Sequence, residues 1–260
     1  DFGERTADHA HGIRNHVHRA TLHGAVEQRS HFGIHFVLLY PIVGRTGVLL
    51  LSRTDDGSLF VSSDVLRIGA VIVAAGMSSR MGDFKPMLSI GSQSIARRIV
   101  STLRQAEAEE IVMITGHNAD ALERHLEGCG LTFIRNERYA TTQMFDSAAL
   151  GLDYLKDKCG RILFTPVDVP LFEASTARAL IDSGAELACP VCDGKRGHPI
   201  LIAARLVDGI LAYSGDGGLG KAMAACGETM IEIPVNDPGS LRDADTPEDY
   251  KTLLGMYEKR

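Results

Sequence analysis

The sequence predicts an α/β fold in which a mostly parallel sheet carries helices on both faces. From residue 68 onward, short apolar runs of strand length alternate with amphipathic stretches of helical length, as in successive strand–helix–strand units. The chain has 260 residues, of which 45% are hydrophobic, so it can bury a sizeable core. The first sixty-odd residues lack this alternation. We therefore expect an N-terminal appendage over residues 1–66 and an α/β domain over 67–260.

The N-terminal appendage has two parts with different sequence patterns. Residues 1–31 show no convincing periodicity, and the segment up to residue 35 holds seven of the ten histidines. Paired H-x-H spacings would let two imidazoles bind zinc, but no cysteine or carboxylate pattern completes a site, and a loosely ordered segment is the favoured interpretation. Residues 35–42, 48–52 and 59–62 are separated by turn-type sequences and predict a small β-meander.

The α/β domain begins with a buried strand. Residues 70–75 form an apolar run that is typical of a strand covered on both faces. A helix is expected over 94–106, because apolar residues recur every four positions from Ile95 to Leu103. The short apolar run 111–115 completes a strand–helix–strand unit. Later helices are expected from 118 to 128, over 147–156 and over 174–183, and later strands over 131–135, 161–165, 187–191, 199–203 and 229–235.

The last helix has the clearest start signal. Thr246 is placed to cap it, Pro247 suits its first turn, and Asp249 stands three residues after Thr246, as in a capping box. Its apolar face is then supplied by Tyr250, Leu253, Leu254 and Tyr257. In sheets of this kind ligands bind at the carboxyl ends of the strands, where the loop after strand 70–75 would lie.

That loop has the composition of a phosphate-binding turn. The strand stops at Gly76, and the following residues include Ser78, Ser79 and two cations, Arg80 and Lys85. Small residues let backbone N–H groups approach an anion, and cations five positions apart can fold over the same phosphates. The alternative is an ordinary turn after a strand, with two solvated cations.

Carboxylates follow at a second point of the predicted sheet edge. Asp168 comes directly after strand 161–165 and is flanked by two prolines that restrict the backbone. Mg²⁺ prefers oxygen ligands and usually takes one or two carboxylates together with phosphate oxygens, so a second acid is expected. Asp243 and Asp245 are the candidates. The alternatives are a turn acid for Asp168 and a helix-capping role for Asp245.

Two glycine-rich loops, 194–199 and 215–220, are candidates to line the same mouth. Within the first loop, His198 is placed to contact an anionic acceptor, although a histidine at the start of a strand is more often structural. Cys189 and Cys192 form a C-x-x-C pair, but Cys189 falls in an apolar strand and no second pair exists. Neutral thiols are therefore favoured over a metal or redox pair.

Composition narrows the functional classes. A formal net charge of −6 argues against a nucleic-acid-binding surface, which needs clustered excess lysine and arginine. Five cysteines, an odd number scattered through apolar segments, suit free thiols in a reducing cytosol, so we expect a cytoplasmic protein. The most apolar stretch, 32–51, contains His35, Pro41 and Arg45 and would be an expensive membrane span, and a long polar segment precedes it, unlike a signal peptide.

Six segments together carry a resemblance to a known family. They read AAGMSSRMGDFKPML, ITGH, NERY with MFDS, PVDVP, GKRGHPIL and DADTPEDY, and they occur in the family's order between about residues 68 and 258. Over this range the chain resembles the MobA-like NTP transferases, and most closely their molybdenum-cofactor (molybdopterin) cytidylyltransferase branch. The resemblance implies a three-layer α/β/α nucleotidyltransferase fold, which is Rossmann-like.

The resemblance also implies roles for individual residues. The nucleotide would contact Ala75, Gly76, Met77, Arg80, Lys85, Gly116 and His117, Asp168 and Asp245 would hold Mg²⁺, and Arg80, Lys85 and Asp168 would be catalytic. The acceptor would contact Ser147, Gly197, His198 and Asp216. An acceptor phosphate would attack the α-phosphate of the nucleoside triphosphate and expel pyrophosphate, a reaction that needs mainly positioning and charge neutralisation.

Three hypotheses follow for the function. The leading one is Mg²⁺-dependent transfer of CMP from CTP to molybdopterin, with CTP favoured over GTP because AAG rather than a double glycine follows the strand. The second is transfer to a sugar 1-phosphate or another small phosphorylated molecule, because residues 140–147, reading ATTQMFDS, depart from the family pattern. The third is a non-catalytic accessory protein that binds a nucleotide or the cofactor and serves a molybdoenzyme or its maturation factor.

Overall fold

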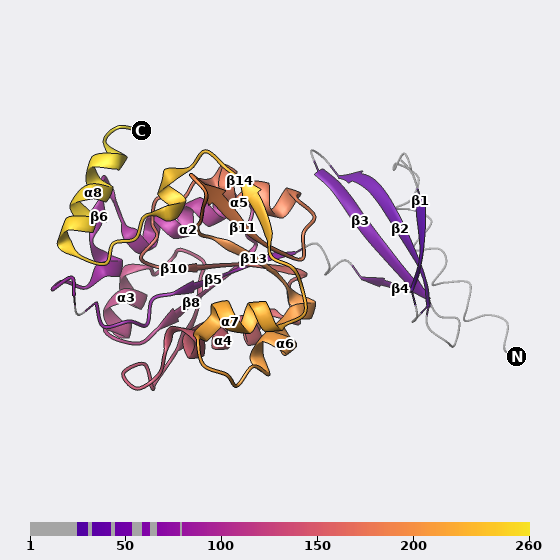
Figure 1. Cartoon of the computed structure of the whole chain (residues 1–260), viewed down its shortest axis with the longest axis horizontal. Helices are drawn as coiled ribbons and strands as arrows, with labels where there is room; N and C mark the ends of the chain where they lie inside the picture. Colours follow the sequence, from indigo (N-terminus) through magenta and orange to yellow (C-terminus); the bar gives the residue numbers. More distant parts are fainter. Residues whose placement is uncertain (1–24, 31–32, 43–44, 54–58, 63–66, 79) are drawn as a thin grey trace, which may run out of the picture. The chain divides into compact units, whose positions relative to one another are not determined.

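The structure is a computed structural model, and it falls into two compact units, Asp1–Leu66 and Arg67–Arg260, which are described separately (Figure 1). The residues that it describes are 25–30, 33–42, 45–53, 59–62 and 67–260 except 79.

The first unit contains a four-stranded antiparallel sheet in the order β1-β2-β3-β4. Its strands are β1 (Ala25–Ser30), β2 (Gly33–Ile42), β3 (Arg45–Arg53) and β4 (Leu59–Ser62). Strand β1 lies within residues 1–31, where no regular structure was expected. Its own sequence has only weak periodicity, and its register is set by pairing with β2. The histidines from His9 to His23, and with them the zinc alternative, lie outside the described residues.

The second unit is built on an eight-stranded mixed sheet. Its main path runs β12-β11-β13-β10-β5-β8-β9, and β14 pairs with β11. The strands are β5 (Ile68–Val73), β8 (Glu110–Thr115), β9 (Thr132–Arg135), β10 (Arg161–Pro166), β11 (Leu187–Cys192), β12 (Lys195–Arg196), β13 (Ile200–Ala203) and β14 (Ile231–Pro234). Strands β10, β5, β8 and β9 are mutually parallel, whereas β13 runs antiparallel between β10 and β11. The predicted mostly parallel sheet is confirmed.

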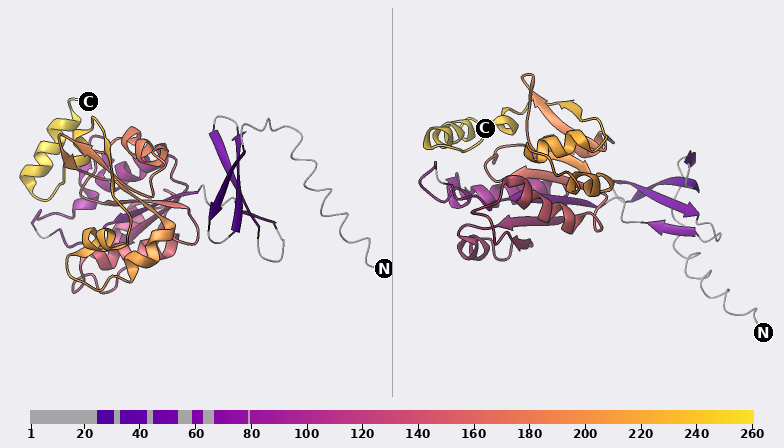
Figure 2. Two further views of the ribbon diagram at one scale, coloured as in Figure 1. Left: turned by 45° about the vertical axis from the view of Figure 1, so that its right-hand side comes forward. Right: turned by 60° about the horizontal axis from the view of Figure 1, so that its bottom comes forward.

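Helices cover both faces of this sheet (Figures 1 and 2). One layer contains α2 (Ile95–Gln105), α3 (Ala119–His125), α5 (Ala174–Asp182) and α8 (Pro247–Tyr257), and the other contains α4 (Met144–Leu155), α6 (Val207–Leu211) and α7 (Gly218–Ala225). Successive residues of β5 alternate between two apolar cores, with Ile72 in the first and Val71 in the second. The predicted three-layer α/β/α fold is therefore confirmed.

Capping residues in the sequence predict the start of some helices correctly but not of others. Thr246 and Asp249 form the predicted capping box of α8. Helix α4 begins at Met144, three residues before the expected start, because Gln143 and Asp146 form a capping box of their own. Asn118, expected to cap α3, makes no side-chain capping bond and adopts a left-handed conformation with φ of 53°.

Some elements were missed. Residues 215–220 were expected to form a loop at the mouth of the site, but α7 already begins at Gly218, because its apolar residues pack in the core that it shares with α4. The short elements are the 3₁₀ helices Lys85–Met87, Ala204–Leu206 and Pro238–Leu241 and the two-stranded pair Ser89–Ile90 with Gln93–Ser94. Within the described part of the chain, no helix combines the length and the apolar character that a bilayer crossing requires.

Candidate active site

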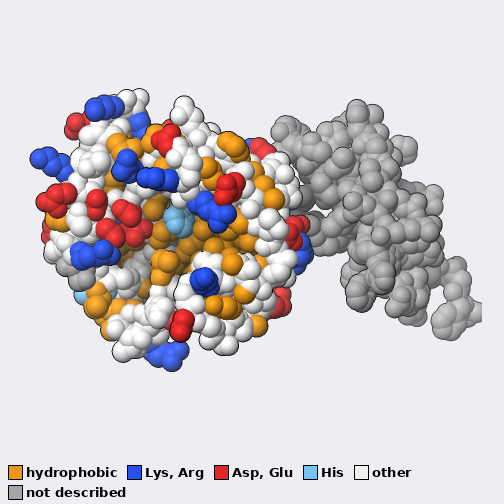
Figure 3. All heavy atoms as spheres, viewed as in Figure 1, with side chains coloured by type: hydrophobic (Ala, Val, Ile, Leu, Met, Phe, Trp, Pro, Cys, Tyr) orange, Lys and Arg blue, Asp and Glu red, His pale blue; other side chains and the backbone are white. Residues whose placement is uncertain are grey.

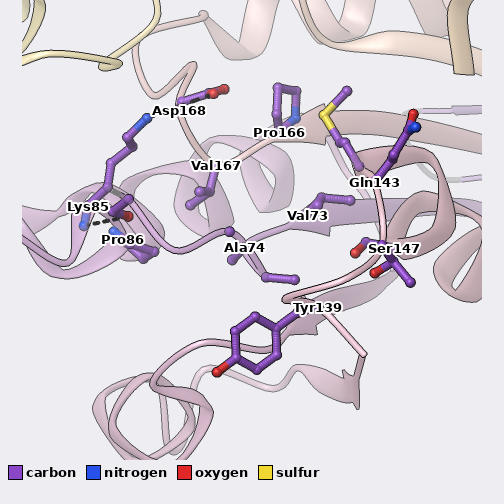
Figure 4. A pocket seen from close by; sticks show the side chains of 15 residues that line it. Val73, Ala74, Lys85, Pro86, Tyr139, Gln143, Ser147, Pro166, Val167 and Asp168 are labelled. Carbon is purple, nitrogen blue, oxygen red and sulfur yellow. Dashed lines mark hydrogen bonds and ion pairs between the residues drawn. The ribbon is translucent and has the colours of Figure 1, made fainter. Parts of the chain in front are cut away.

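A pocket of about 210 Å³ opens at the carboxyl ends of β5 and β10. Its walls come from the residues after β5, from Lys85 and Pro86, from the residues at the end of β10, and from the segment that leads into α4. Figure 4 shows the Lys85 side chain reaching toward Asp168 at one end, with Gln143 and Ser147 at the other. The pocket therefore lies where the predicted α/β fold places ligands.

The loop after β5 presents its backbone to the pocket. Ala74 and Ala75 are buried and line the wall, and Gly76 follows with open space where a side chain would stand. A side chain at position 76 would enter this space, so glycine keeps the backbone accessible. Ser78 also lines the wall, and its Oγ accepts a hydrogen bond of 3.3 Å from the Lys85 N–H. Met77 is exposed and lies outside the pocket lining.

Lys85 joins the loop to both carboxylates. Its Nζ lies 2.9 Å from Asp245 Oδ1 and 4.0 Å from Asp168 Oδ2, and only 10% of its side chain is exposed. Arg80 Nη2 lies 2.8 Å from Asp245 Oδ2, but its side chain is 73% exposed. The backbone N–H of Ala244 donates to the Asp168 carbonyl at 2.8 Å, which fixes the loop before α8 against the end of β10. Four predicted site residues thus converge.

The two carboxylates have opposite pKa shifts. Burial raises the pKa of Asp168, the charges of Asp245 and Asp243 raise it further, and Lys85 opposes them. The hydrogen bond from Lys85 lowers the pKa of Asp245, and Arg80 contributes in the same direction. On the face shown in Figure 3, acidic side chains gather beside lysine and arginine side chains, next to an apolar hollow. A half-buried carboxylate beside two others gains from an added positive charge.

The donor set fits a hard divalent cation. Asp168 and Asp245 supply carboxylate oxygens, and the pocket beside them has room for phosphate oxygens. Among the described residues no group of three or more histidine, cysteine, aspartate or glutamate side chains forms a complete metal cage. Two carboxylates beside such a pocket suit a metal that arrives with a phosphate ligand, as Mg²⁺ commonly does.

Gly116 and His117 support the pocket without lining it. A Cβ at Gly116 would lie 2.7 Å from Tyr139 Cβ and 2.9 Å from the Ala75 carbonyl oxygen, so only glycine fits there. The His117 N–H donates to the Ala75 carbonyl at 3.3 Å, and its ring lies between Phe84 and Tyr139 at centroid distances of 5.9 and 6.0 Å. Both residues hold Ala75 and Tyr139 in place.

The four predicted acceptor residues are not brought together in one cavity. Ser147 lines the pocket, and its Oγ accepts a hydrogen bond of 3.0 Å from Asn136 Nδ2. Gly197 packs against Ser240, where a Cβ would lie 2.6 Å from the Ser240 carbonyl oxygen, and neither it nor His198 lines this pocket. Asp216 is exposed, and its carbonyl accepts a hydrogen bond from the Tyr213 hydroxyl at 2.9 Å.

His198 has the features of a packed histidine. Its ring contacts the edge of Phe164, its Nδ1 is buried with no hydrogen-bond partner among the described residues, and burial lowers its pKa to about 4. The peptide bond between His198 and Pro199 is cis. The imidazole is therefore neutral at pH 7 and offers no charge to an anionic acceptor.

The C-x-x-C pair has no bonded partner. Cys189 and Cys192 are both buried and free, and burial raises the pKa of the Cys189 thiol. This agrees with the interpretation of neutral thiols.

Segment 140–147 was expected to face the acceptor and forms one wall of the pocket, but sequence reasoning named only Ser147 in it as a site residue. Tyr139, Thr142, Gln143 and Met144 line it together with Ser147, and all five belong to the turn and first helical turn after β9. The departure of residues 140–147 from the family pattern marked this segment, and the Q-x-x-D spacing of its capping box would have placed the start of α4 correctly.

Curated proteins of known name match part of this chain. A curated relative, the bifunctional protein GlmU of Methylibium petroleiphilum, is 32% identical over 132 residues, which is 48% of this chain and 26% of the relative. The chain thus matches only about a quarter of that protein's length. A match over so small a part of that protein does not assign a role to any residue of this chain.

Solved structures share the fold. A nucleotidyl transferase from Methanothermobacter superposes with a TM-score of 0.66 at 22% identity, over 74% of this chain and 98% of that one. Rv0371c from Mycobacterium tuberculosis, in a complex with manganese, superposes with a TM-score of 0.60 at 22% identity, over 73% and 98% of the two chains. The family of the MobA-like NTP transferase domain matches residues 70–230, more than half of the sequence. Because this match covers more than half of the sequence, the chain belongs to the MobA-like NTP transferase domain family.

Proposed function

We propose that the unit Arg67–Arg260 is a nucleotidyltransferase that moves a nucleotidyl group from a nucleoside triphosphate to a phosphorylated acceptor and releases pyrophosphate. The single observation that carries the proposal is the position of Lys85, at 2.9 Å from Asp245 and 4.0 Å from Asp168, in a pocket that Gly76 also lines. A buried cation between two carboxylates, beside an accessible backbone turn, suits a triphosphate that arrives with a metal.

Asp168 and Asp245 would hold Mg²⁺ through their carboxylate oxygens. When bound, this ion would neutralise part of the charge on the triphosphate and on the departing pyrophosphate. The raised pKa of Asp168 supports this assignment, because burial and the charges of Asp245 and Asp243 disfavour its ionised form and a divalent cation would offset both effects. The manganese complex of the similar M. tuberculosis protein is consistent with a divalent metal in this fold.

The cations would exchange partners when the substrate binds. Lys85 and Arg80 contact Asp245 in the structure, and the triphosphate offers both of them stronger anionic partners once the metal occupies the carboxylate. An oxygen of the acceptor phosphate would attack the α-phosphorus, the bond to the bridging α–β oxygen would break, and the electron pair would leave with pyrophosphate. Lys85 and Arg80 would stabilise the charge that develops on this leaving group.

CTP and molybdopterin are the proposed substrates because the sequence motifs resemble the cytidylyltransferase branch. A sugar 1-phosphate is the second candidate acceptor. It is favoured by the uncharged end of the pocket, where Thr142, Gln143 and Ser147 offer hydroxyl and amide groups that can hydrogen-bond a sugar.

Release of pyrophosphate tests the proposal. The purified full chain is incubated with CTP, GTP, UTP or ATP and Mg²⁺ or Mn²⁺, with molybdopterin or glucose 1-phosphate as the acceptor, and the nucleotidylated product is identified by mass spectrometry. We expect metal-dependent release of pyrophosphate, largest with CTP and molybdopterin. Product with glucose 1-phosphate alone would select the second candidate. Tight, metal-dependent nucleotide binding without product from any combination would contradict catalysis and favour an accessory binding role.

A further inference from the structure

A second cavity lies on the helical layer that contains α2, α5 and α8, and it shares no lining residue with the strand-end pocket. Helices α2 and α5 lie on the same side of the sheet, as Figure 1 shows. The cavity encloses about 580 Å³ and is bordered by the exposed face of α2, the first turn of α5 and the C-terminal end of α8.

Arg98 is the main cation of this cavity and carries unused donors. Its guanidinium lies over the Tyr257 ring, with its Cζ 4.3 Å from the centroid, and its Nη2 donates to the Ile90 carbonyl at 2.9 Å. Its Nε is buried and has no hydrogen-bond partner among the described residues, and no described carboxylate forms an ion pair with it. The buried Nε is not accessible from the cavity, so a ligand there would meet the Nη groups, whose charge no described carboxylate neutralises.

The other walls of the cavity add donors around Arg98. Hydroxyl and amide groups of Ser101, Thr102 and Gln105 face it from α2, and the first turn of α5 lines the opposite part with its positive dipole end. Arg260 supplies a second guanidinium, although Asp237 and Glu173 lie 3.4 and 3.8 Å from its Nη2 and neutralise part of its charge. The uncompensated positive charge is therefore that of Arg98.

We propose that this cavity binds the phosphate group of a small polyhydroxylated molecule, such as a sugar phosphate or polyol phosphate. The Nη groups of Arg98 can donate charge-assisted hydrogen bonds to a phosphate, and the hydroxyl and amide side chains of α2 can bind the hydroxyl groups of the same ligand. A flat base is disfavoured because the face of Tyr257 is covered by Arg98. This site is independent of the proposed transfer reaction.

Amide NMR titration of the full chain tests the proposal, with inorganic phosphate, glycerol 2-phosphate and glycerol as probes at constant ionic strength. Both phosphates are expected to shift the amide signals of residues 98–105 and 174–176 in a saturable way, and glycerol 2-phosphate should bind more tightly than inorganic phosphate. Glycerol alone should not shift these signals. Binding at the strand-end pocket shifts residues 76–85 instead, so the two sites are read separately. Arg98→Gln is expected to weaken binding here about tenfold or more, because it removes a charge-assisted pair.

Two further variants keep the test decisive. Arg97→Gln removes the same charge one position away on α2 but lies outside the cavity lining, and it should change the affinity less than about twofold. Ser101→Asp places a carboxylate on the cavity wall without removing the contact of Arg98 with Tyr257, and it should abolish binding even if Arg98→Gln loosens the fold. The proposal would be overturned if Arg98→Gln and Arg97→Gln bound the phosphates with equal affinity or if glycerol bound as tightly as glycerol 2-phosphate. It would also be overturned if only the signals of residues 76–85 shifted.

Discussion

The two ends of the strand-end pocket are built in different ways. At the charged end, Lys85 pairs with Asp245, which is 160 positions away in the sequence, and lies close to Asp168 at the end of β10. The uncharged end is closed by one local segment, in which Asn136 Nδ2 donates to Thr142 at 2.9 Å and to Ser147 at 3.0 Å. The first arrangement suits phosphates and a metal, which any nucleoside triphosphate brings. The second suits selection among bases or acceptors.

The largest expected effect lies at the charged end. Asp168→Asn should reduce the rate of pyrophosphate release about a thousandfold, because it removes a proposed metal ligand and with it the main neutralisation of the triphosphate. Burial and two neighbouring carboxylates raise the pKa of Asp168, so its charge is unfavourable in the metal-free fold, and the melting temperature should stay unchanged or rise. Steady-state kinetics and thermal melting of the metal-free protein measure the two effects.

Asp243→Asn is the matched control for that substitution. Asp243 precedes Asp245 in the same loop, is exposed, and raises the pKa of Asp168 from a distance. Its substitution should change turnover by no more than a few fold. A thousandfold loss in Asp243→Asn with little loss in Asp168→Asn would move the metal site to the other carboxylate and contradict the geometry assigned to this end of the pocket.

Lys85 should have the second largest effect. Lys85→Gln is expected to slow turnover roughly a hundredfold, because it removes the buried cation that faces both carboxylates and would face the departing pyrophosphate. Arg80→Gln, at an exposed side chain that contacts Asp245 alone, should slow it less, about tenfold. A Lys85 variant that melts at a much lower temperature but turns over normally once folded would show that the lysine serves only the fold.

The third prediction concerns His198, which was expected to meet the acceptor and instead packs against Phe164. Burial lowers its pKa to about 4, below the ordinary value near 6.5. Between these two pH values the unfolded chain therefore binds a proton that the folded chain does not. Its contribution to stability is therefore complete above about pH 6.5 and is lost as the pH falls toward 4, by on the order of 2 kcal/mol.

Denaturant unfolding of the parent and of His198→Gln at a series of pH values measures this contribution. The difference in unfolding free energy between the two proteins should shrink as the pH falls from about 7 to 4.5. A constant difference over this range would mean that the imidazole takes up a proton in the folded state as readily as in the unfolded one.

The sequence predicts best those features of the fold and the site that depend on local residue patterns. Buried strands, the capping box of Thr246 and Asp249, and the assignment of Lys85 and Asp168 to one edge follow from local patterns and from the rule that parallel strands end together. The place of Asp245 beside them was implied by the family resemblance. The antiparallel β13 and the wall that contains Tyr139 were not predictable in this way. Their positions depend on long-range pairing with β10 and on packing around Gly116, which local patterns do not encode.

The smallest expected effect lies at the uncharged end. Ser147→Ala removes the hydroxyl that accepts a hydrogen bond from Asn136 and faces the pocket, while Asn136 keeps its bond to Thr142. We expect KM for one substrate to rise roughly three- to fivefold, as for the loss of one neutral hydrogen bond, with kcat nearly unchanged. Kinetics with several triphosphates and acceptors would show which substrate this end contacts.

Thr141→Ala is the control for this substitution, because Thr141 belongs to the same segment, donates its hydroxyl hydrogen bond to the Arg138 carbonyl, and does not line the pocket. It should leave every KM within about twofold of the parent value. If both variants raised KM equally, the effect would come from loosening the segment. If Ser147→Ala lowered kcat equally for all substrates, the hydroxyl would act on the shared phosphate chemistry, and the two ends of the pocket would not divide their tasks as inferred.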